Sequence, residues 1–210
     1  MPNDLLSVVL LFGVLLVSLT IHEAAHALTA DRLGDPTARR LGRVSLNPIV
    51  HIDLIGTVIL PLIAAISRLP IIGWAKPVPV DTRNLRHPAR DFAIVAAAGP
   101  ISNLLQGIVA AMVYRVLAAS GAGGNGPALV LSILSYYVEI NLLLAFFNLI
   151  PVPPLDGGNV LLGLLPPRLA YRYSQIRRYG FLILYALLLT GVASALIMPP
   201  TSTLLRILLP

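Results

Sequence analysis

Apolar residues follow one another along this chain in long stretches, and short connections rich in glycine, proline or charge separate them. About 20 apolar residues suffice for a helix to cross a bilayer. Four stretches approach or exceed that length, at residues 5–30, 92–118, 128–149 and 179–197. A shorter stretch, residues 52–66, contains Gly56 and Pro61. The pattern predicts an all-α polytopic membrane protein with about five transmembrane helices and a re-entrant segment.

The connection after the first apolar stretch has a different pattern. Residues 31–48 contain four turn-forming residues, Gly34, Pro36, Gly42 and Pro48. The residues around 43–46 alternate between polar and apolar, which is typical of a strand with one buried face. We therefore expect a small β-hairpin at the membrane surface.

Composition supports a membrane protein of one domain. The chain has 210 residues, of which 57% are hydrophobic and only 11% are charged, whereas about 25% are charged in soluble domains. No long polar stretch could fold separately, so residues 1–210 are expected to form a single domain. The first apolar stretch lacks a basic start and a cleavage-like boundary, and we interpret it as a retained helix. Without cysteine, any metal must be bound by histidine and carboxylate groups.

The net charge of +6 comes from 15 basic and 9 acidic residues. These basic residues lie in loops between apolar stretches, which favours a lipid bilayer and not nucleic acid as the partner. If residues 52–66 re-enter, every basic residue except Arg115 and Arg206 lies on one face, and if they cross, that bias is lost. The positive-inside rule therefore predicts re-entry, with the basic face in the cytoplasm of a multi-pass protein of the cell membrane.

Ionisable residues inside an apolar stretch are costly and usually functional, and three lie within residues 22–26. His22 and His26 are four residues apart, so a helix places both imidazoles on one face, where they can reach one zinc ion. Glu23 is next to a ligand without being one, and it can accept a proton from a water molecule that the metal activates. The alternative is that the histidines satisfy each other or backbone carbonyls inside a helix bundle.

A catalytic zinc ion usually has three protein ligands, and Asp156 is our candidate for the third. It follows the stretch at residues 128–149, in a segment whose prolines and glycines interrupt the helix and can direct the carboxylate inward. An ordinary helix-ending loop with a solvated aspartate is the alternative. Re-entry of residues 52–66 places Asp156 at the same membrane face as the histidine pair, whereas a full crossing separates them by about a bilayer thickness.

Three motifs make the chain resemble the site-2 protease family, peptidase family M50, over about residues 8–165. They are HEAAH at residues 22–26, GPISN at residues 99–103, and the segment from Asn148 to Gly157. The loop from Gly73 to Val80 is similar to that of a compact bacterial subgroup without a PDZ domain. The resemblance implies one Zn2+ per chain, held by His22, His26 and Asp156, with Glu23 as the general base.

The same resemblance implies a function. It is that of a zinc-dependent intramembrane endopeptidase, which hydrolyses peptide bonds in or next to the transmembrane segments of membrane proteins. It also implies that Asn148 helps to bind the substrate or the oxyanion, as an amide donor is able to do. In a helical substrate the carbonyl to be attacked is engaged in a backbone hydrogen bond, so the substrate must unwind first. We hypothesise that a strand in residues 40–48, or the Trp74 loop, pairs with the unwound substrate as an added strand.

The sequence also permits other functions and other roles for several polar residues. A membrane zinc transporter or metal-binding protein could use the same ligands, and a catalytically silent relative could act as a binding partner. Asn103 suits either packing of its span or lining of the site. His51 and His87 are interpreted as surface residues without a role, and Trp74 and several tyrosines as interfacial anchors.

Overall fold

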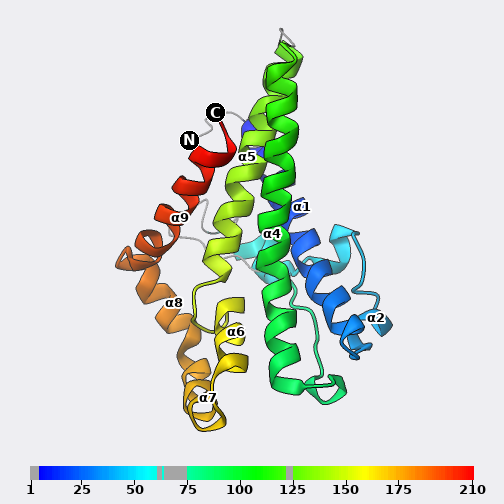
Figure 1. Cartoon of the computed structure of the whole chain (residues 1–210), viewed down its shortest axis with the longest axis vertical. Coiled ribbons are helices and arrows are strands. Elements are labelled where there is room, and N and C mark those ends of the chain that lie inside the picture. The colour runs from blue at the N-terminus through cyan, green and yellow to red at the C-terminus, as the bar shows by residue number, and fades with distance from the viewer. Residues whose placement is uncertain (1–4, 61–62, 64–74, 122–124) are drawn as a thin grey trace.

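The computed structural model describes residues 5–60, 63, 75–121 and 125–210. Its longest helices are α1 (Leu5–Arg32), α4 (Pro88–Ala119) and α5 (Asn125–Asn148). The helix α4 packs against α1, α5 and α6 and therefore stands at the centre of the bundle (Figure 1). In the part of the chain that the structure describes there is no β-strand, as the all-α prediction requires.

Shorter helices complete the described chain. They are α2 (Thr37–Arg40), η1 (Pro48–His51), the π-helix η2 (Leu54–Ile59), η3 (Thr82–Asn84), α6 (Asp156–Leu164), α7 (Pro167–Ser174), η4 (Gln175–Tyr179), α8 (Gly180–Leu189) and α9 (Val192–Leu208).

Three helices of the described chain are long and apolar enough to cross a membrane, at Val9–Arg32 in α1, Pro88–Ala119 in α4 and Ala128–Asn148 in α5. A fourth span results only if the bent pair Pro167–Leu189 and Val192–Leu208 counts as one. The membrane character of the chain is confirmed, whereas the prediction of about five spans is not.

The predicted single span at residues 179–197 is two helices in the structure. The pair bends by 70°, and the break lies at Gly191, whose φ of +77° is a left-handed conformation that glycine adopts at little cost. Thr190 ends α8 and its backbone N–H still bonds to Ala186. The bend lets α8 lie beside the segment before α6, while α9 packs along α5.

The β-hairpin predicted within residues 31–48 does not form. Pro36 precedes the short helix α2 instead, and Gly42 ends that helix with a φ of +68°. The Arg43 N–H donates to the Ala38 carbonyl at 2.8 Å, which is a typical helix-ending hydrogen bond. The Arg43 N–H used in this cap is therefore not available for pairing with a second strand.

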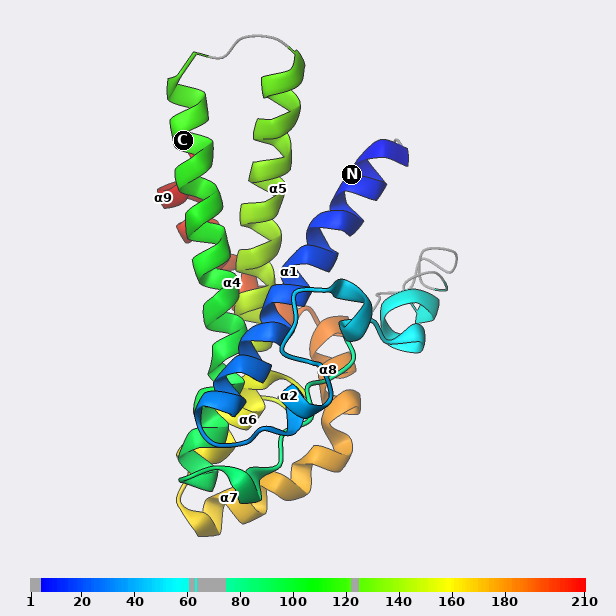
Figure 2. The same ribbon diagram turned by 90° about the vertical axis from the view of Figure 1, so that its right-hand side faces the viewer.

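Residues 61, 62 and 64–66 of the stretch at residues 52–66 lie outside the described residues. The described part contains the six-residue helix η2, whose first turn is capped by Asp53 through the N–H groups of Ile55 and Gly56. The helix α1 ends and α4 begins at the same end of the bundle (Figure 2). Re-entry of residues 52–66 stays a prediction, because part of the chain between the two helices lies outside the described residues.

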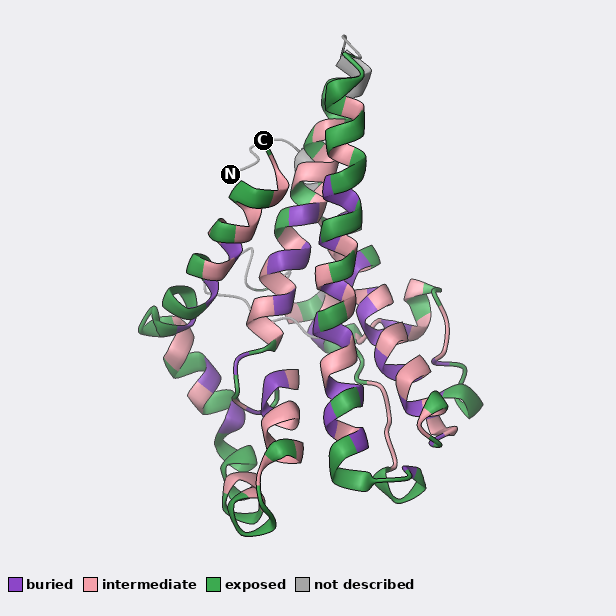
Figure 3. Ribbon diagram, in the orientation of Figure 1, coloured by how far each residue is buried: buried purple, intermediate pink, exposed green. Residues whose placement is uncertain are grey.

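Many residues of the bundle helices are exposed (Figure 3), and a large share of the exposed side chains are hydrophobic. Large hydrophobic side chains such as Leu105, Val116 and Leu182 are exposed on the spans and on α8. Inside, small residues such as Ala110 and Ala111 allow α4 to approach Val138 and Leu142 of α5 closely. Small residues at helix contacts are typical of membrane bundles, where backbones must approach closely to gain van der Waals contact.

Candidate metal centre

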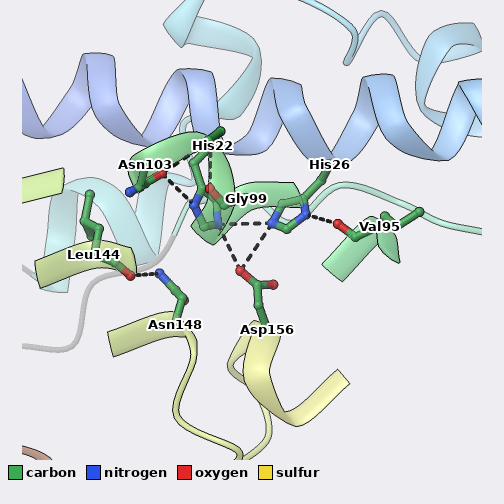
Figure 4. Close-up of polar contacts among 9 residues, drawn as sticks. His22, His26, Val95, Gly99, Asn103, Leu144, Asn148 and Asp156 are labelled. Atoms are coloured by element: carbon green, nitrogen blue, oxygen red, sulfur yellow. Dashed lines mark hydrogen bonds and ion pairs between the residues drawn. The ribbon is translucent and has the colours of Figure 1, made fainter. Parts of the chain in front are cut away.

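Side chains from two distant segments converge inside the bundle (Figure 4). One nitrogen each of His22 and His26 and one carboxylate oxygen of Asp156 lie within 4.8 Å of one another. The two Nε2 atoms are 3.0 Å apart, and Asp156 Oδ2 lies 3.0 Å from that of His22 and 3.3 Å from that of His26. The three predicted ligands therefore meet at one point.

Each imidazole is oriented by a hydrogen bond at its other nitrogen. Nδ1 of His26 lies 2.7 Å from the carbonyl oxygen of Val95. A carbonyl only accepts, so Nδ1 donates its proton and Nε2 presents a lone pair to the cluster. Nδ1 of His22 lies 3.0 Å from Oδ1 of Asn103 in the same arrangement. This is the outer-shell support that metal-binding histidines typically have.

The close approach of α4 to α1 depends on a glycine. A Cβ atom built on Gly99 would lie 2.4 Å from Nε2 of His26 and 2.5 Å from Nε2 of His22. No other residue type leaves this space free, because every other amino acid carries a Cβ. The following residue, Pro100, lies inside α4 and is buried.

Asp156 is positioned by the turn that precedes it. The chain reverses direction after α5, and Asp156 is the first residue of α6, where backbone N–H groups favour a carboxylate. A Cβ atom on the next residue, Gly157, would lie 2.3 Å from the carbonyl oxygen of Leu149. The turn is therefore tight enough to require glycine, and it brings the carboxylate to the histidine pair.

The predicted catalytic residues Glu23 and Asn148 line the same cavity of about 690 Å³ as the cluster. Glu23 is buried on α1, directly after His22. Asn148 is the last residue of α5, and its Nδ2 donates to the carbonyl oxygen of Leu144 at 3.0 Å. Its amide is thus at the cavity but turned toward its own helix.

These residues fit a zinc ion. Two imidazole nitrogens and one carboxylate oxygen are a ligand set that catalytic zinc uses, with one position left for water or substrate. Oδ2 of Asp156 is buried and has no hydrogen-bond partner of acceptable geometry, although both Nε2 atoms lie nearby. Among the described residues, no other group of three or more such side chains is close enough to share a metal.

A segment without helical structure covers one side of the cavity. We call residues 75–81 the strap, and four of its residues line the cavity: Ala75, Pro77, Val78 and Val80. Trp74, which precedes it, lies outside the described residues. At the downstream end, hydrogen bonds from Arg83 lower the pKa of the Asp81 carboxyl to about 2.

Comparison with known proteins places this geometry in a family. The model of peptidase family M50 matches residues 123–191. The YwhC protein of Bacillus subtilis, provisionally named a zinc metalloprotease, is 37% identical over 190 residues, or 88% of this chain and 82% of YwhC. This chain belongs to peptidase family M50.

Two further relatives are longer than this M50 chain. The Rip2 protein of Mycolicibacterium smegmatis is 31% identical over 83% of the chain, and the chain spans 64% of Rip2. The Rip3 protein of Mycobacterium tuberculosis is 34% identical over 70% of the chain, and the chain spans 28% of Rip3. Both are provisionally named zinc metalloproteases. No solved structure matches the chain.

The family model extends the part of the chain that is similar to other M50 members toward the C-terminus. It includes Asn148 and Asp156 and continues to residue 191, beyond residue 165, where the motif resemblance ended. The additional part packs on the turn before Asp156. A Cβ atom on Gly180 of α8 would lie 2.3 Å from the carbonyl oxygen of Pro153, and Tyr173 donates a hydrogen bond to that of Pro151 at 2.9 Å. The M50 core thus includes elements that support the third ligand.

Several polar residues lie differently from their sequence interpretation. Asn103 is fully buried and contacts His22, so it supports the site and does not only pack its helix. His51 is only 3% exposed and is not a surface residue. His87 is exposed, as expected. The GPISN motif contained the signal for Gly99 and Asn103, whereas nothing local to His51 indicates its burial.

Proposed function

We propose that this M50 member is a zinc-dependent endopeptidase that hydrolyses peptide bonds in or next to the transmembrane segments of other membrane proteins. Family membership and the ligand set make it a zinc metallopeptidase. The observation that supports the location of the reaction is the position of His22 and His26 on a helix long and apolar enough to cross the bilayer.

The ligands are prepared for a metal before it binds. Because Val95 and Asn103 accept the Nδ1 protons, His22 and His26 offer Nε2 lone pairs without losing a proton. Asp156 adds a negative charge to the two neutral ligands. Zinc bound here supplies a Lewis acid and lowers the pKa of water to near neutrality.

Glu23 is the general base of the proposal. It lines the same cavity as the cluster without being one of the three ligands. It accepts the proton of the attacking water and returns it to the leaving amine, a role that typically contributes about 10²–10⁴-fold in rate. Asn148 donates its amide to the oxygen of the scissile carbonyl after turning away from Leu144.

The strap supplies a backbone for the unwound substrate. Of the two segments that we considered for this role, residues 40–48 form no strand. In the strap, Pro77 and Pro79 favour an extended backbone for the residues before them. In the described part of the chain the N–H groups of Val78 and Val80 have no hydrogen-bond partner, and both residues line the cavity. They are free to bond to a substrate strand.

The basic end of the bundle faces the cytoplasm in this proposal. The connection from α1 to α4 with the adjoining ends of these two helices, together with α7 and η4, carries every basic residue except Arg115 and Arg206. Positive charge is retained on the cytoplasmic side of membranes. The active site then opens toward the cytoplasm from within the cell membrane. Transport of zinc would need ligands at successive depths, and the described residues provide one cluster.

One experiment tests the proposal directly. Purified wild-type protein and Glu23→Gln are reconstituted in liposomes with a panel of single-span substrates, and zinc content and cleavage are measured in both. We expect about one zinc per chain in each and cleavage by the wild type alone. Zinc crossing the liposome membrane without any cleavage would instead support the transporter.

A further inference from the structure

Three buried polar side chains outside the active site converge on the strap. Asp35 is fully buried, His51 is 3% exposed and Arg43 is 5% exposed. All three follow α1 in the chain, and the proposed chemistry uses none of them. Burying charged groups is costly unless they are hydrogen-bonded or paired, so their partners indicate what they do.

The upstream end of the strap is held at both backbone groups of one residue. Nη2 of Arg43 donates to the carbonyl oxygen of Lys76, and the N–H of Lys76 donates to the carbonyl oxygen of His51 at 2.8 Å. The imidazole of His51 is fixed in turn by Nε2, which donates to the carbonyl oxygen of Ser45 at 2.8 Å. The side chain of Lys76 remains exposed, so the contacts hold its backbone.

The downstream end is held by a carboxylate. Oδ2 of Asp35 accepts the N–H of Asp81 at 2.7 Å. Oδ1 accepts from Nδ2 of Asn84 at 3.0 Å and from the N–H of Thr37 at 3.1 Å. Oγ1 of Thr37 also donates to Oδ1. Burial opposes the charge of Asp35, yet the hydrogen bonds, first of all the one from the Thr37 side chain, outweigh it and lower the pKa of the carboxyl. The ionised side chain therefore connects the end of α1 to the end of the strap.

Between these two ends the strap lines the same cavity as the catalytic groups. Val78 and Val80 lie there with Glu23 and His22. The guanidinium of Arg43 also interacts electrostatically with the active site. Burial lowers the pKa of Arg43, and the nearby charge of Glu23 acts in the opposite direction. The strap is thus held at its two ends, while the N–H groups of Val78 and Val80 between them have no partner among the described residues.

We propose that Arg43 and Asp35 are positioning residues that hold the strap against the active-site cavity and thereby determine how tightly the enzyme binds the peptide segment that it cuts. This inference rests on the proposed proteolytic function. Neither residue touches the reacting atoms. Loss of either contact frees one end of the strap, so substrate binding weakens while the metal and Glu23 remain in place.

The test compares Arg43→Met and Asp35→Asn with the wild type in liposomes that contain a cleavable single-span substrate. Hydrogen bonds to charged groups are stronger than neutral ones, and we expect KM to rise about tenfold, with kcat within about twofold and zinc content unchanged. In Arg43→Lys the KM should rise less than in Arg43→Met, because an ammonium group can still donate to the Lys76 carbonyl. Arg40→Met is the matched control, since Arg40 is exposed on α2 and no hydrogen bond or ion pair joins its side chain to the strap in the described part of the chain.

Amide hydrogen exchange gives a readout that does not depend on activity. Residues 75–81 should exchange faster in both variants, while α1 and α4 keep their protection. Faster exchange throughout the bundle of both variants, with loss of zinc, would show that the contacts serve folding and would overturn the positioning role. A wild type that cleaves, with variants of unchanged KM, would contradict this inference alone. A wild type that cleaves nothing would contradict the proposed function, and the exchange of the strap would still show whether these residues hold it.

Discussion

Gly99 of α4 faces the imidazole of His22 so closely that a Cβ atom at residue 99 would lie 2.5 Å from its Nε2 atom. Both histidines belong to α1, and the glycine belongs to a helix that begins more than fifty residues later. The metal site therefore exists only because two helices meet where one of them has no side chain.

Replacing Gly99 with alanine should remove the metal. Alanine is intrinsically better than glycine inside a helix by about 0.5–1 kcal/mol, so α4 itself is not weakened. The added methyl group, however, would occupy the space of both Nε2 atoms. We expect Gly99→Ala to bind little zinc and to cleave no substrate, as measured by elemental analysis and by the liposome assay.

The matched control is Gly107→Ala on the same helix, where the nearest atom to the new Cβ would be Cδ2 of Leu142 at 3.6 Å. This is an ordinary contact, so zinc binding and cleavage should be retained. Normal zinc content in Gly99→Ala would mean that the imidazoles do not lie where the structure places them.

Asn103 should control the affinity for zinc and not the chemistry itself. It is buried and accepts the proton of Nδ1 of His22. Loss of such outer-shell partners typically lowers metal affinity about 10–100-fold. We expect this decrease for Asn103→Ala in a chelator competition, and a smaller one for Asn103→Asp, which keeps an acceptor oxygen.

Ser102→Ala provides the comparison for Asn103, because Oγ of Ser102 donates mainly to the carbonyl oxygen of Gly99 in its own helix. Equal zinc affinity in all three variants would show that His22 does not need Asn103 for its orientation.

The sequence was sufficient for the features that depend on local spacing. Long apolar runs predicted α1, α4 and α5 because a bilayer imposes a length that few other structures need. The spacing of His22 and His26 predicted both on one helix face, and re-entry of residues 52–66 predicted Asp156 at the same membrane face. Each of these predictions needed only the helical period, the length of a membrane span and the membrane face at which each segment ends.

Other features depend on contacts between distant segments and left no local signal. The bend at Gly191 needs a left-handed residue, and the sequence does not reveal which glycine in an apolar run adopts one. Around Arg43 the short alternation indicated a strand, but the cap after α2 competed successfully for the same backbone. The burial of His51 follows from its backbone bond to Lys76, a residue 25 positions later.

Asn148 should contribute to the rate once substrate is bound. A donor to a developing oxyanion typically accounts for about 10²–10³-fold in kcat. We therefore expect Asn148→Ala to lower kcat by about that factor while zinc content stays near that of the wild type. In the structure its Nδ2 donates to Leu144, so removal of the amide frees only one carbonyl of α5. A change in KM alone would assign Asn148 to substrate binding.

Asp35 should make the stability of the protein depend on pH in the acidic range. Its pKa is lowered in the folded state, whereas a carboxyl of this type titrates near pH 3.9 when unfolded. Its contribution is therefore complete above about pH 4 and is lost as the pH falls through the lower folded pKa. The difference in melting temperature between wild type and Asp35→Asn should be large at pH 6 and should narrow toward pH 3. A constant difference would mean that Asp35 is not ionised.

Proline at residue 80 should block cleavage without removing the metal. Val80 lines the cavity, and its N–H is one of two donors that the strap offers to a substrate strand. Proline lacks that donor, and Val80 is not a ligand. We expect Val80→Pro to retain zinc and to lose at least about tenfold in kcat/KM, because a missing backbone hydrogen bond leaves a substrate carbonyl unpaired in a partly buried site. Leu46→Pro is the control, since Leu46 is 70% exposed in the segment that forms no strand. If Leu46→Pro abolished cleavage and Val80→Pro did not, the substrate would pair with residues 40–48 and not with the strap.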